Sequence, residues 1–149
     1  MFTAANPDHV TIAVADVDAA VEFFALFGFR KDHVARIDGG VPAEYMGMPD
    51  MHADHVTLVL DCAARFEIQL LRFDDLPPDT DSTTSNRHRH GFNHLALRVD
   101  DLDQASADLQ ANGVRALNDA MTFISRRLRF FEGPEGVTIE LVEWIEPAS

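Results

Sequence analysis

Two histidines, His9 and His94, stand at equivalent places in two similar stretches of the chain. Residues 8–30 and residues 93–115 align without a gap at a constant offset of 85. Such self-similarity indicates two copies of one structural unit. Each histidine opens a run in which apolar and polar residues alternate, and this pattern predicts a strand. Imidazole is the commonest metal ligand among side chains, so both histidines are candidates for a shared site.

An amide and a carboxylate form a second matched pair. Residues 64–73 and residues 135–144 also alternate, and they align at an offset of 71, which places Gln69 on Glu140. Strand alternation puts both side chains on the face opposite the apolar one, as it does for the two histidines. Polar groups in a sheet interior are costly unless they find partners. A metal ion would satisfy all four side chains together.

The four side chains would form a mixed nitrogen and oxygen site for Zn²⁺, Mn²⁺, Fe²⁺, Co²⁺ or Ni²⁺, with positions open for water or substrate. The predicted ligands are His9, Gln69, His94 and Glu140. Glu67 lies on the same strand face as Gln69 and competes for the fourth place, although the repeat favours Gln69. Without Gln69, the two histidines and Glu140 form the triad typical of non-haem iron oxygenases.

The remaining histidines have no partner in the repeat. His33, His52 and His55 are interpreted as surface or loop residues. His88 and His90 fall in a polar stretch between the two copies, which is interpreted as a solvated linker. None of the five is therefore included in the predicted site.

Each copy also carries helix signals after its first strand. Asp16 and Asp101 suit a helix N-cap, and Gly28 and Gly113 stand where a left-handed C-cap is expected. Each copy therefore predicts the order β-α-β-β-β. We expect an α+β fold in which two tandem βαβββ modules form a curved eight-stranded mixed sheet around a cup, with the helices outside.

The module boundaries follow from the repeat and from the composition between its copies. We expect a single domain over residues 1–149, with one module at about 8–73, a linker at about 74–91 and the other module at about 92–145. The linker is rich in Pro, Ser, Thr and Asp, as linkers are. The first copy is longer in its middle, and its surplus is expected in a loop over residues 39–54.

The composition narrows the class of protein. The chain has 149 residues, of which 46% are hydrophobic and 25% charged. No apolar run approaches the roughly 18–20 residues of a membrane span, and the N-terminus lacks signal-peptide features, so a cytoplasmic protein is expected. The single cysteine, Cys62, cannot form an internal disulfide, which fits a reducing compartment. The net charge of −13 disfavours nucleic acid and anionic membranes as partners.

Taken together, these segments resemble the vicinal oxygen chelate superfamily, the group of glyoxalase I, bleomycin-resistance proteins and extradiol dioxygenases. The likeness covers residues 8–144, and it is most specific where a Gly-Pro-Glu-Gly turn at 133–136 precedes Ile-Glu-Leu at 139–141. The fold of that family is a paired βαβββ arrangement. The resemblance places metal ligands at the four positions predicted above, and this ligand set looks most like the methylmalonyl-CoA epimerase branch.

The resemblance implies a divalent-metal-dependent isomerase, epimerase or lyase. The ion acts as a Lewis acid and stabilises an enolate while a base removes the adjacent proton. The base would be Glu140 displaced from the metal, Glu67 or Glu44, with Glu140 the first choice by resemblance. A small-molecule substrate and a homodimer are also implied. Two alternatives stay open: an Fe(II) extradiol-type dioxygenase that uses His9, His94 and Glu140, and a metal-free small-molecule binding or resistance protein.

Overall fold

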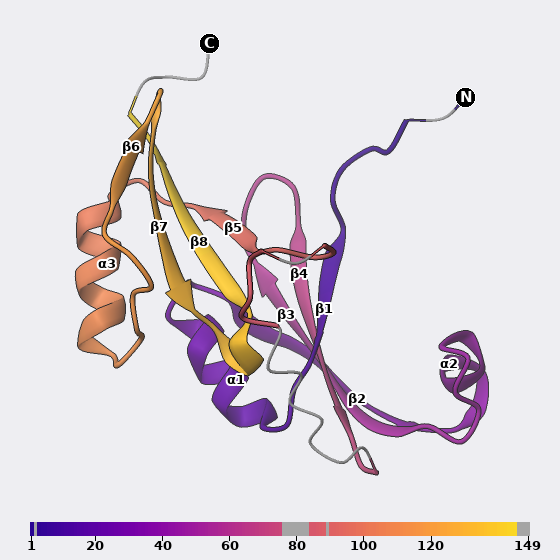
Figure 1. Cartoon of the computed structure of the whole chain (residues 1–149). Coiled ribbons are helices and arrows are strands. Elements are labelled where there is room, and N and C mark those ends of the chain that lie inside the picture. The colour runs from indigo at the N-terminus through magenta and orange to yellow at the C-terminus, as the bar shows by residue number, and fades with distance from the viewer. Residues whose placement is uncertain (2, 76–83, 89, 146–149) are drawn as a thin grey trace. The chain divides into compact units, whose positions relative to one another are not determined.

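The chain folds as two compact units, each built around one four-stranded sheet (Figure 1). Each unit has the order β-α-β-β-β, so the predicted pair of βαβββ modules is confirmed. Within the described residues the strands form two hydrogen-bonded sheets of four, both mixed. The computed structural model describes residues 1, 3–75, 84–88 and 90–145.

The first unit, Met1–Asp79, holds α1 against one face of its sheet. The strand order is β1-β4-β3-β2, with β1 parallel to β4 and the other pairs antiparallel. Ala20 and Phe24 of α1 are buried, while α2 lies at the far end of the β2–β3 hairpin (Figure 1). The elements are β1 (His9–Ala13), α1 (Val17–Ala25), β2 (Arg30–Asp38), α2 (Gly40–Tyr45), β3 (His52–Leu60) and β4 (Phe66–Phe73).

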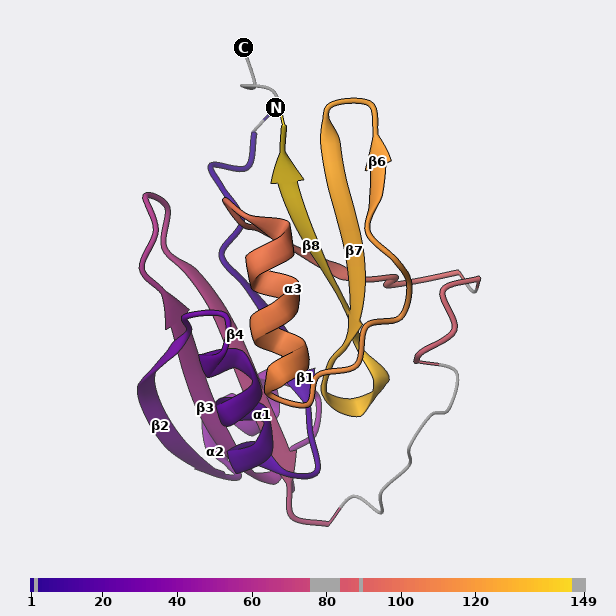
Figure 2. The same ribbon diagram turned by 90° about the vertical axis from the view of Figure 1, so that its left-hand side faces the viewer.

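The second unit, Thr80–Ser149, repeats this arrangement with a shorter hairpin. The strand order is β5-β8-β7-β6, and α3 runs along β7 and β8 (Figure 2). Leu102 and Leu109 of α3 are buried, as are Phe131 of β7 and Ile139 of β8. The elements are β5 (Leu95–Arg98), α3 (Leu102–Ala111), β6 (Met121–Phe123), β7 (Arg126–Glu132), the 3-10 turn Pro134–Gly136 and β8 (Thr138–Trp144).

The ends of α1 and α3 follow the sequence signals. Asp16 and Asp101 each accept a hydrogen bond from the backbone N–H three residues on, at 3.0 and 2.9 Å. Gly28 and Gly113 take φ values of 90° and 83°, a region that side chains other than glycine rarely occupy. The predicted N-caps and left-handed glycines are therefore confirmed in both units.

The extra residues of the first unit are not a plain loop. Residues 39–54 contain α2 and the first residues of β3, so the predicted loop is wrong in this respect. A helix this short is unstable by itself, and tertiary contacts hold it in place. Ala43 and Met51 form a buried cluster with Ala53 and Leu71 of the sheet. The insertion therefore builds a cap on one end of the sheet.

Arginines tie the β2–β3 hairpin to the end of β4. Arg36 donates hydrogen bonds to Asp54 and Asp74, and Arg72 donates to Asp54. The bond from Arg72, followed by that from Arg36, lowers the pKa of Asp54. The bond from Arg36 lowers the pKa of Asp74 in the same way. These charged pairs connect the β2–β3 hairpin to the residues at the end of β4.

The predicted linker is described only in part. Residues 76–83 and residue 89 lie outside the described part of the chain, and the boundary between the two compact units falls after Asp79. Cys62 is exposed in the turn between β3 and β4. Among the helices that the structure describes, none is long and apolar enough to cross a membrane.

Candidate metal centre

The first unit places one predicted histidine and the predicted amide on the same face of its sheet. His9 begins β1, and Gln69 lies in the middle of β4. The Nδ1 atom of His9 stands 2.5 Å from Oδ1 of Asp8. A carboxylate can only accept, so this ring nitrogen carries the proton and donates. The lone pair of the imidazole is therefore on Nε2, where it can bind a metal.

In the second unit, the side chain before His94 sets the tautomer of this histidine in the same way. The side-chain nitrogen of Asn93 donates to the backbone carbonyl of Arg87 at 2.7 Å, which turns its Oδ1 toward His94. That oxygen accepts from Nδ1 of His94 at 2.8 Å, so Nε2 again carries the lone pair. The Nε2 atom lies 3.7 Å from Oε1 of Glu140. This separation is too long for a hydrogen bond. The nitrogen of His94 and the oxygen of Glu140 therefore both remain available to coordinate a metal ion.

Asp8 and Asn93 are themselves equivalent in the repeat, at the same offset of 85 as the two histidines. Histidines that bind metals almost always donate their other ring N–H to a carboxylate, a carbonyl or water, which fixes the tautomer. These two hydrogen bonds to the histidines were not predicted from the sequence. Their signal was present, because the residue before each of His9 and His94 has an oxygen-bearing side chain of the same length.

Strand register gives Gln69 and Glu140 the same place in their units. Gln69 stands opposite Thr11 in the parallel pair β1–β4, and Glu140 stands opposite Ala96 in the parallel pair β5–β8. Thr11 and Ala96 are equivalent in the repeat. Glu67, the competing residue, lies two positions earlier on β4. The register therefore agrees with the alignment that favoured Gln69.

The four predicted ligands divide two and two between the units, and their meeting in one site stays a prediction. Among the described residues, no group of three or more His, Cys, Asp or Glu side chains lies together as a metal site. Bond lengths of about 2.0–2.2 Å allow one ion to touch two atoms as much as about 4 Å apart. His94 Nε2 and Glu140 Oε1, at 3.7 Å, fit within that reach. The donor set thus suits a divalent ion.

The three candidate bases have different surroundings. Glu67 accepts hydrogen bonds from Arg65 at 2.7 Å and from Gln69 at 3.3 Å, so both of its oxygens are engaged. Glu44 is exposed on α2. Glu140 has a side chain that is only 13% exposed, and it accepts no hydrogen bond from any described residue. Glu140 is therefore the candidate whose oxygens are sheltered and still free to react.

The prediction that His55 is a surface or loop residue is wrong. It lies half-buried in β3, on the same face as Gln69, and its Nε2 stands 3.2 Å from Oε1 of Gln69. Since the amide nitrogen of Gln69 donates to Glu67, its oxygen faces His55. By contrast, His33 and His52 are exposed, as predicted. The alternation that runs from His55 into the buried part of β3 was the signal that could have found it.

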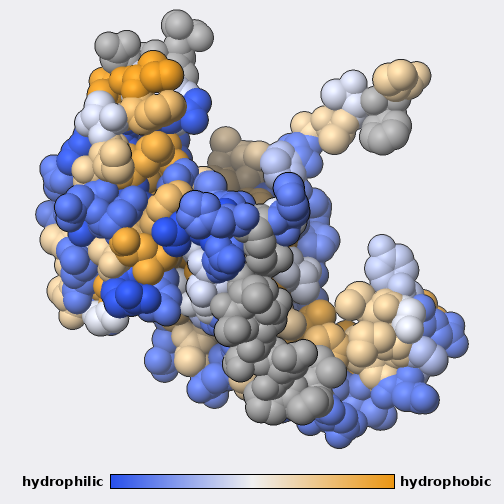
Figure 3. Space-filling view, viewed as in Figure 1, coloured by the Kyte–Doolittle hydropathy of each residue, from blue (hydrophilic) through white to orange (hydrophobic). Residues whose placement is uncertain are grey.

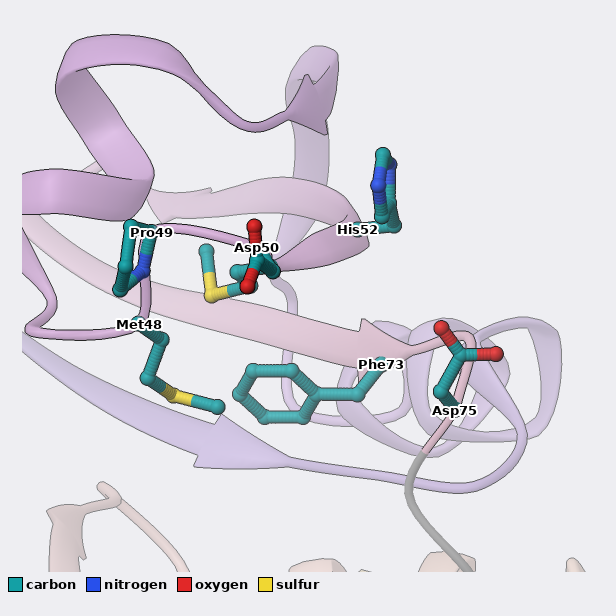
Figure 4. A pocket seen from close by; sticks show the side chains of 7 residues that line it. Met48, Pro49, Asp50, His52, Phe73 and Asp75 are labelled. Carbon is teal, nitrogen blue, oxygen red and sulfur yellow. The ribbon is translucent and has the colours of Figure 1, made fainter.

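The polar face of the first sheet continues into an apolar hollow beside α2. The hollow has a volume of about 260 Å³, and Met48, Pro49 and Phe73 are among the residues that line it (Figure 4). Figure 4 shows the side chain of Met48 reaching toward the ring of Phe73. Phe73 follows Gln69 by four residues on β4 and so shares its face. The hollow therefore lies on the same sheet face as Gln69, roughly 13 Å further along β4.

The fold agrees with a comparison to known families. The chain belongs to the Glyoxalase/Bleomycin resistance protein/Dioxygenase superfamily, whose family model matches residues 8–130. The family resemblance inferred from the sequence is therefore confirmed.

The chain is similar to one curated protein and to two solved structures, as follows. The chain is 31% identical over 151 residues to a 2-epi-5-epi-valiolone epimerase of an Actinomyces species, a match that covers 90% of this chain and 76% of that protein. A glyoxalase family protein of Bacillus cereus has the same fold, with a TM-score of 0.86, 24% identity and 97% of both chains covered. The fosfomycin resistance protein FosX of Listeria monocytogenes, solved with manganese(II), gives a TM-score of 0.63 at 14% identity, covering 98% of this chain and 96% of that one.

Proposed function

We propose that the two modules act as one domain, a divalent-metal-dependent epimerase, isomerase or lyase that works on the carbon next to a carbonyl group. The observation that carries this proposal is that His9 and His94 make equivalent hydrogen bonds. Each donates from Nδ1 to the side chain of the preceding residue, and this leaves Nε2 free to bind. An epimerase at 31% identity among the relatives supports the same class of reaction.

In this proposal, His9, Gln69, His94 and Glu140 hold the ion. A bound divalent ion polarises a carbonyl oxygen and stabilises the negative charge that develops there. Once displaced from the ion, Glu140 would take the proton from the neighbouring carbon. In an isomerisation a proton would return to the other carbon of the enolate, and in an epimerisation it would reach the opposite face of the same carbon from water or a second acid. The sheltered position of Glu140 and its lack of a hydrogen-bond donor among the described residues favour it over Glu67 as the base.

Solvent isotope exchange tests the proposed reaction directly. The protein would be incubated in D₂O, with each of the five candidate metals in turn, together with 2-epi-5-epi-valiolone or methylmalonyl-CoA. Deuterium at the carbon next to the carbonyl, followed by NMR, is the expected result. If neither compound gained deuterium with any of the metals, the proposed reaction on these substrate classes would be wrong. Oxygen consumption with Fe²⁺ and a catechol would favour the dioxygenase alternative instead.

The Asn93→Ala variant is expected to bind the metal about 10–100-fold more weakly than the wild type. The substitution removes the acceptor that fixes the His94 tautomer, while both predicted ligands of the second unit remain in place. Competition with a chelator of known affinity would measure the change. Asn112→Ala is the matched control, because this exposed asparagine bonds only to the backbone at the end of α3. Equal metal affinity in the Asn93→Ala variant and the wild type would argue against the tautomer account.

A further inference from the structure

The single tryptophan of the chain, Trp144, lies between two arginines on the face of the second sheet that carries Glu140. The guanidinium carbon of Arg126 stands 4.0 Å from the centre of the Trp144 ring, and that of Arg98 stands 5.8 Å from it. The three residues come from β7, β8 and β5, and β8 is the central strand of the three. Stacking on an aromatic ring holds a guanidinium in place while its N–H groups stay free to donate.

These two arginines differ in their ionic partners from two other arginines of the second unit. Elsewhere in the second unit, Arg115 pairs with Glu132 and Arg127 pairs with Asp103. Within the described ranges, no carboxylate forms an ion pair with Arg98 or Arg126. Both are exposed. The chain has 25 acidic residues against 12 lysines and arginines. Two exposed arginines on one aromatic ring, with no acidic partner among the described residues, therefore indicate a binding place for an external anion.

The same sheet face connects this pair to the candidate metal centre. Trp144 follows Glu140 by four residues on β8, a distance of roughly 13 Å along a strand. Between them lies Val142, which stands opposite Leu128 of β7. Met121 of β6, which is exposed and stands opposite Leu128, continues the row of apolar side chains formed by Val142 and Leu128. Figure 3 shows apolar side chains gathered at this end of the second unit.

The corresponding place in the first unit is filled by the chain itself. Phe73 is the repeat equivalent of Trp144, at the offset of 71. Phe73 packs against the buried cluster of Ala43 and Met51 at α2. The second unit has no helix between β6 and β7, so its own hairpin supplies no such cover for Trp144. The tryptophan and its two arginines therefore form a surface that the second unit leaves open.

We propose that Arg98 and Arg126, held on Trp144, bind an anionic group of the substrate. The substrate would carry its carbonyl at the Glu140 end, a short apolar stretch over Val142 and Leu128, and a phosphate or carboxylate at the far end. This inference rests on the proposed function, since it assigns a substrate class to the same sheet face. Both kinds of anion suit guanidinium groups, which donate to planar and tetrahedral oxyanions alike.

Trp144 provides the measurement, because the fluorescence of the only tryptophan reports on this one place. The full chain would be titrated with inorganic phosphate, methyl phosphate and propionate at constant ionic strength, with chloride as the balancing anion. We expect a saturable change in emission with the wild type. Arg98→Gln and Arg126→Gln should each weaken the apparent affinity at least about tenfold. Arg115→Gln, which changes an exposed arginine away from Trp144, should leave the affinity unchanged.

The outcomes separate this inference from the proposed reaction. Tighter binding of methyl phosphate than of propionate would assign a phosphorylated substrate, and the reverse order would assign a carboxylic acid. No saturable change with any of the three anions, or equal affinity in the wild type and both arginine variants, would overturn the inference. Neither result depends on turnover, so the anion site could fail while the isotope exchange persists, or the exchange could fail while the site remains.

Discussion

The Glu140→Gln variant should exchange the substrate proton with solvent at least about 100-fold more slowly than the wild type. An amide cannot take up the proton, whereas its oxygen can still serve as a ligand, as the amide of Gln69 would at the equivalent position of the first unit. The metal content should therefore fall less than the exchange rate does. Deuterium incorporation at saturating metal, measured together with metal content, would separate the two effects.

Two further variants decide which carboxylate is the base. Glu67→Gln should retain most of the exchange, because Arg65 and Gln69 already engage both oxygens of that carboxylate. Glu44→Gln should also retain it, since Glu44 is exposed on α2. If the Glu140→Gln variant exchanged at the wild-type rate while one of the others lost activity, Glu140 would not be the base, and the reaction would depend on the first unit.

The Phe131→Ala variant should lose about 3–5 kcal/mol of the free energy of unfolding of the second unit. Phe131 is fully buried in β7, stands opposite the buried Ile139 of β8, and lies under the guanidinium of Arg129. Truncation leaves a cavity that a sheet with α3 on one face can close only in part. Denaturant titration followed by Trp144 fluorescence would measure the loss, because that residue lies in the same unit.

Phe123→Ala is the matched control for this measurement. It removes the same side chain from the same unit, but Phe123 is 65% exposed at the end of β6. Its unfolding free energy should stay within about 0.5 kcal/mol of the wild type. A loss below about 1 kcal/mol for Phe131→Ala would contradict the assignment of Phe131 to the core.

The features that were predicted correctly from the sequence occur in both copies of the internal repeat. Asp16 and Asp101 cap their helices, and Gly28 and Gly113 end them, because capping depends on a few neighbouring residues and local backbone geometry. Strand alternation also fixed the face on which Gln69 lies. A shift of one residue would have buried it among the apolar side chains under α1.

The features that the sequence did not yield depend on contacts between distant residues. The helix α2 is too short to show a periodic pattern, and it is held by contacts of Ala43 and Met51 with the sheet. His55 reaches Gln69 only through the antiparallel pairing of β3 with β4. The stack on Trp144 joins residues from three strands, and nothing local in the chain connects them.

The metal content of the protein tests the central claim most directly. The full chain would be purified without chelator, analysed for divalent metals, and then offered Zn²⁺, Mn²⁺, Co²⁺, Ni²⁺ and, without oxygen, Fe²⁺. We expect about one ion per chain in the wild type and none in the His94→Ala variant, because the proposed site would lose one of its ligands. A folded wild-type protein that holds none of these ions would contradict the metal centre and, with it, the proposed function.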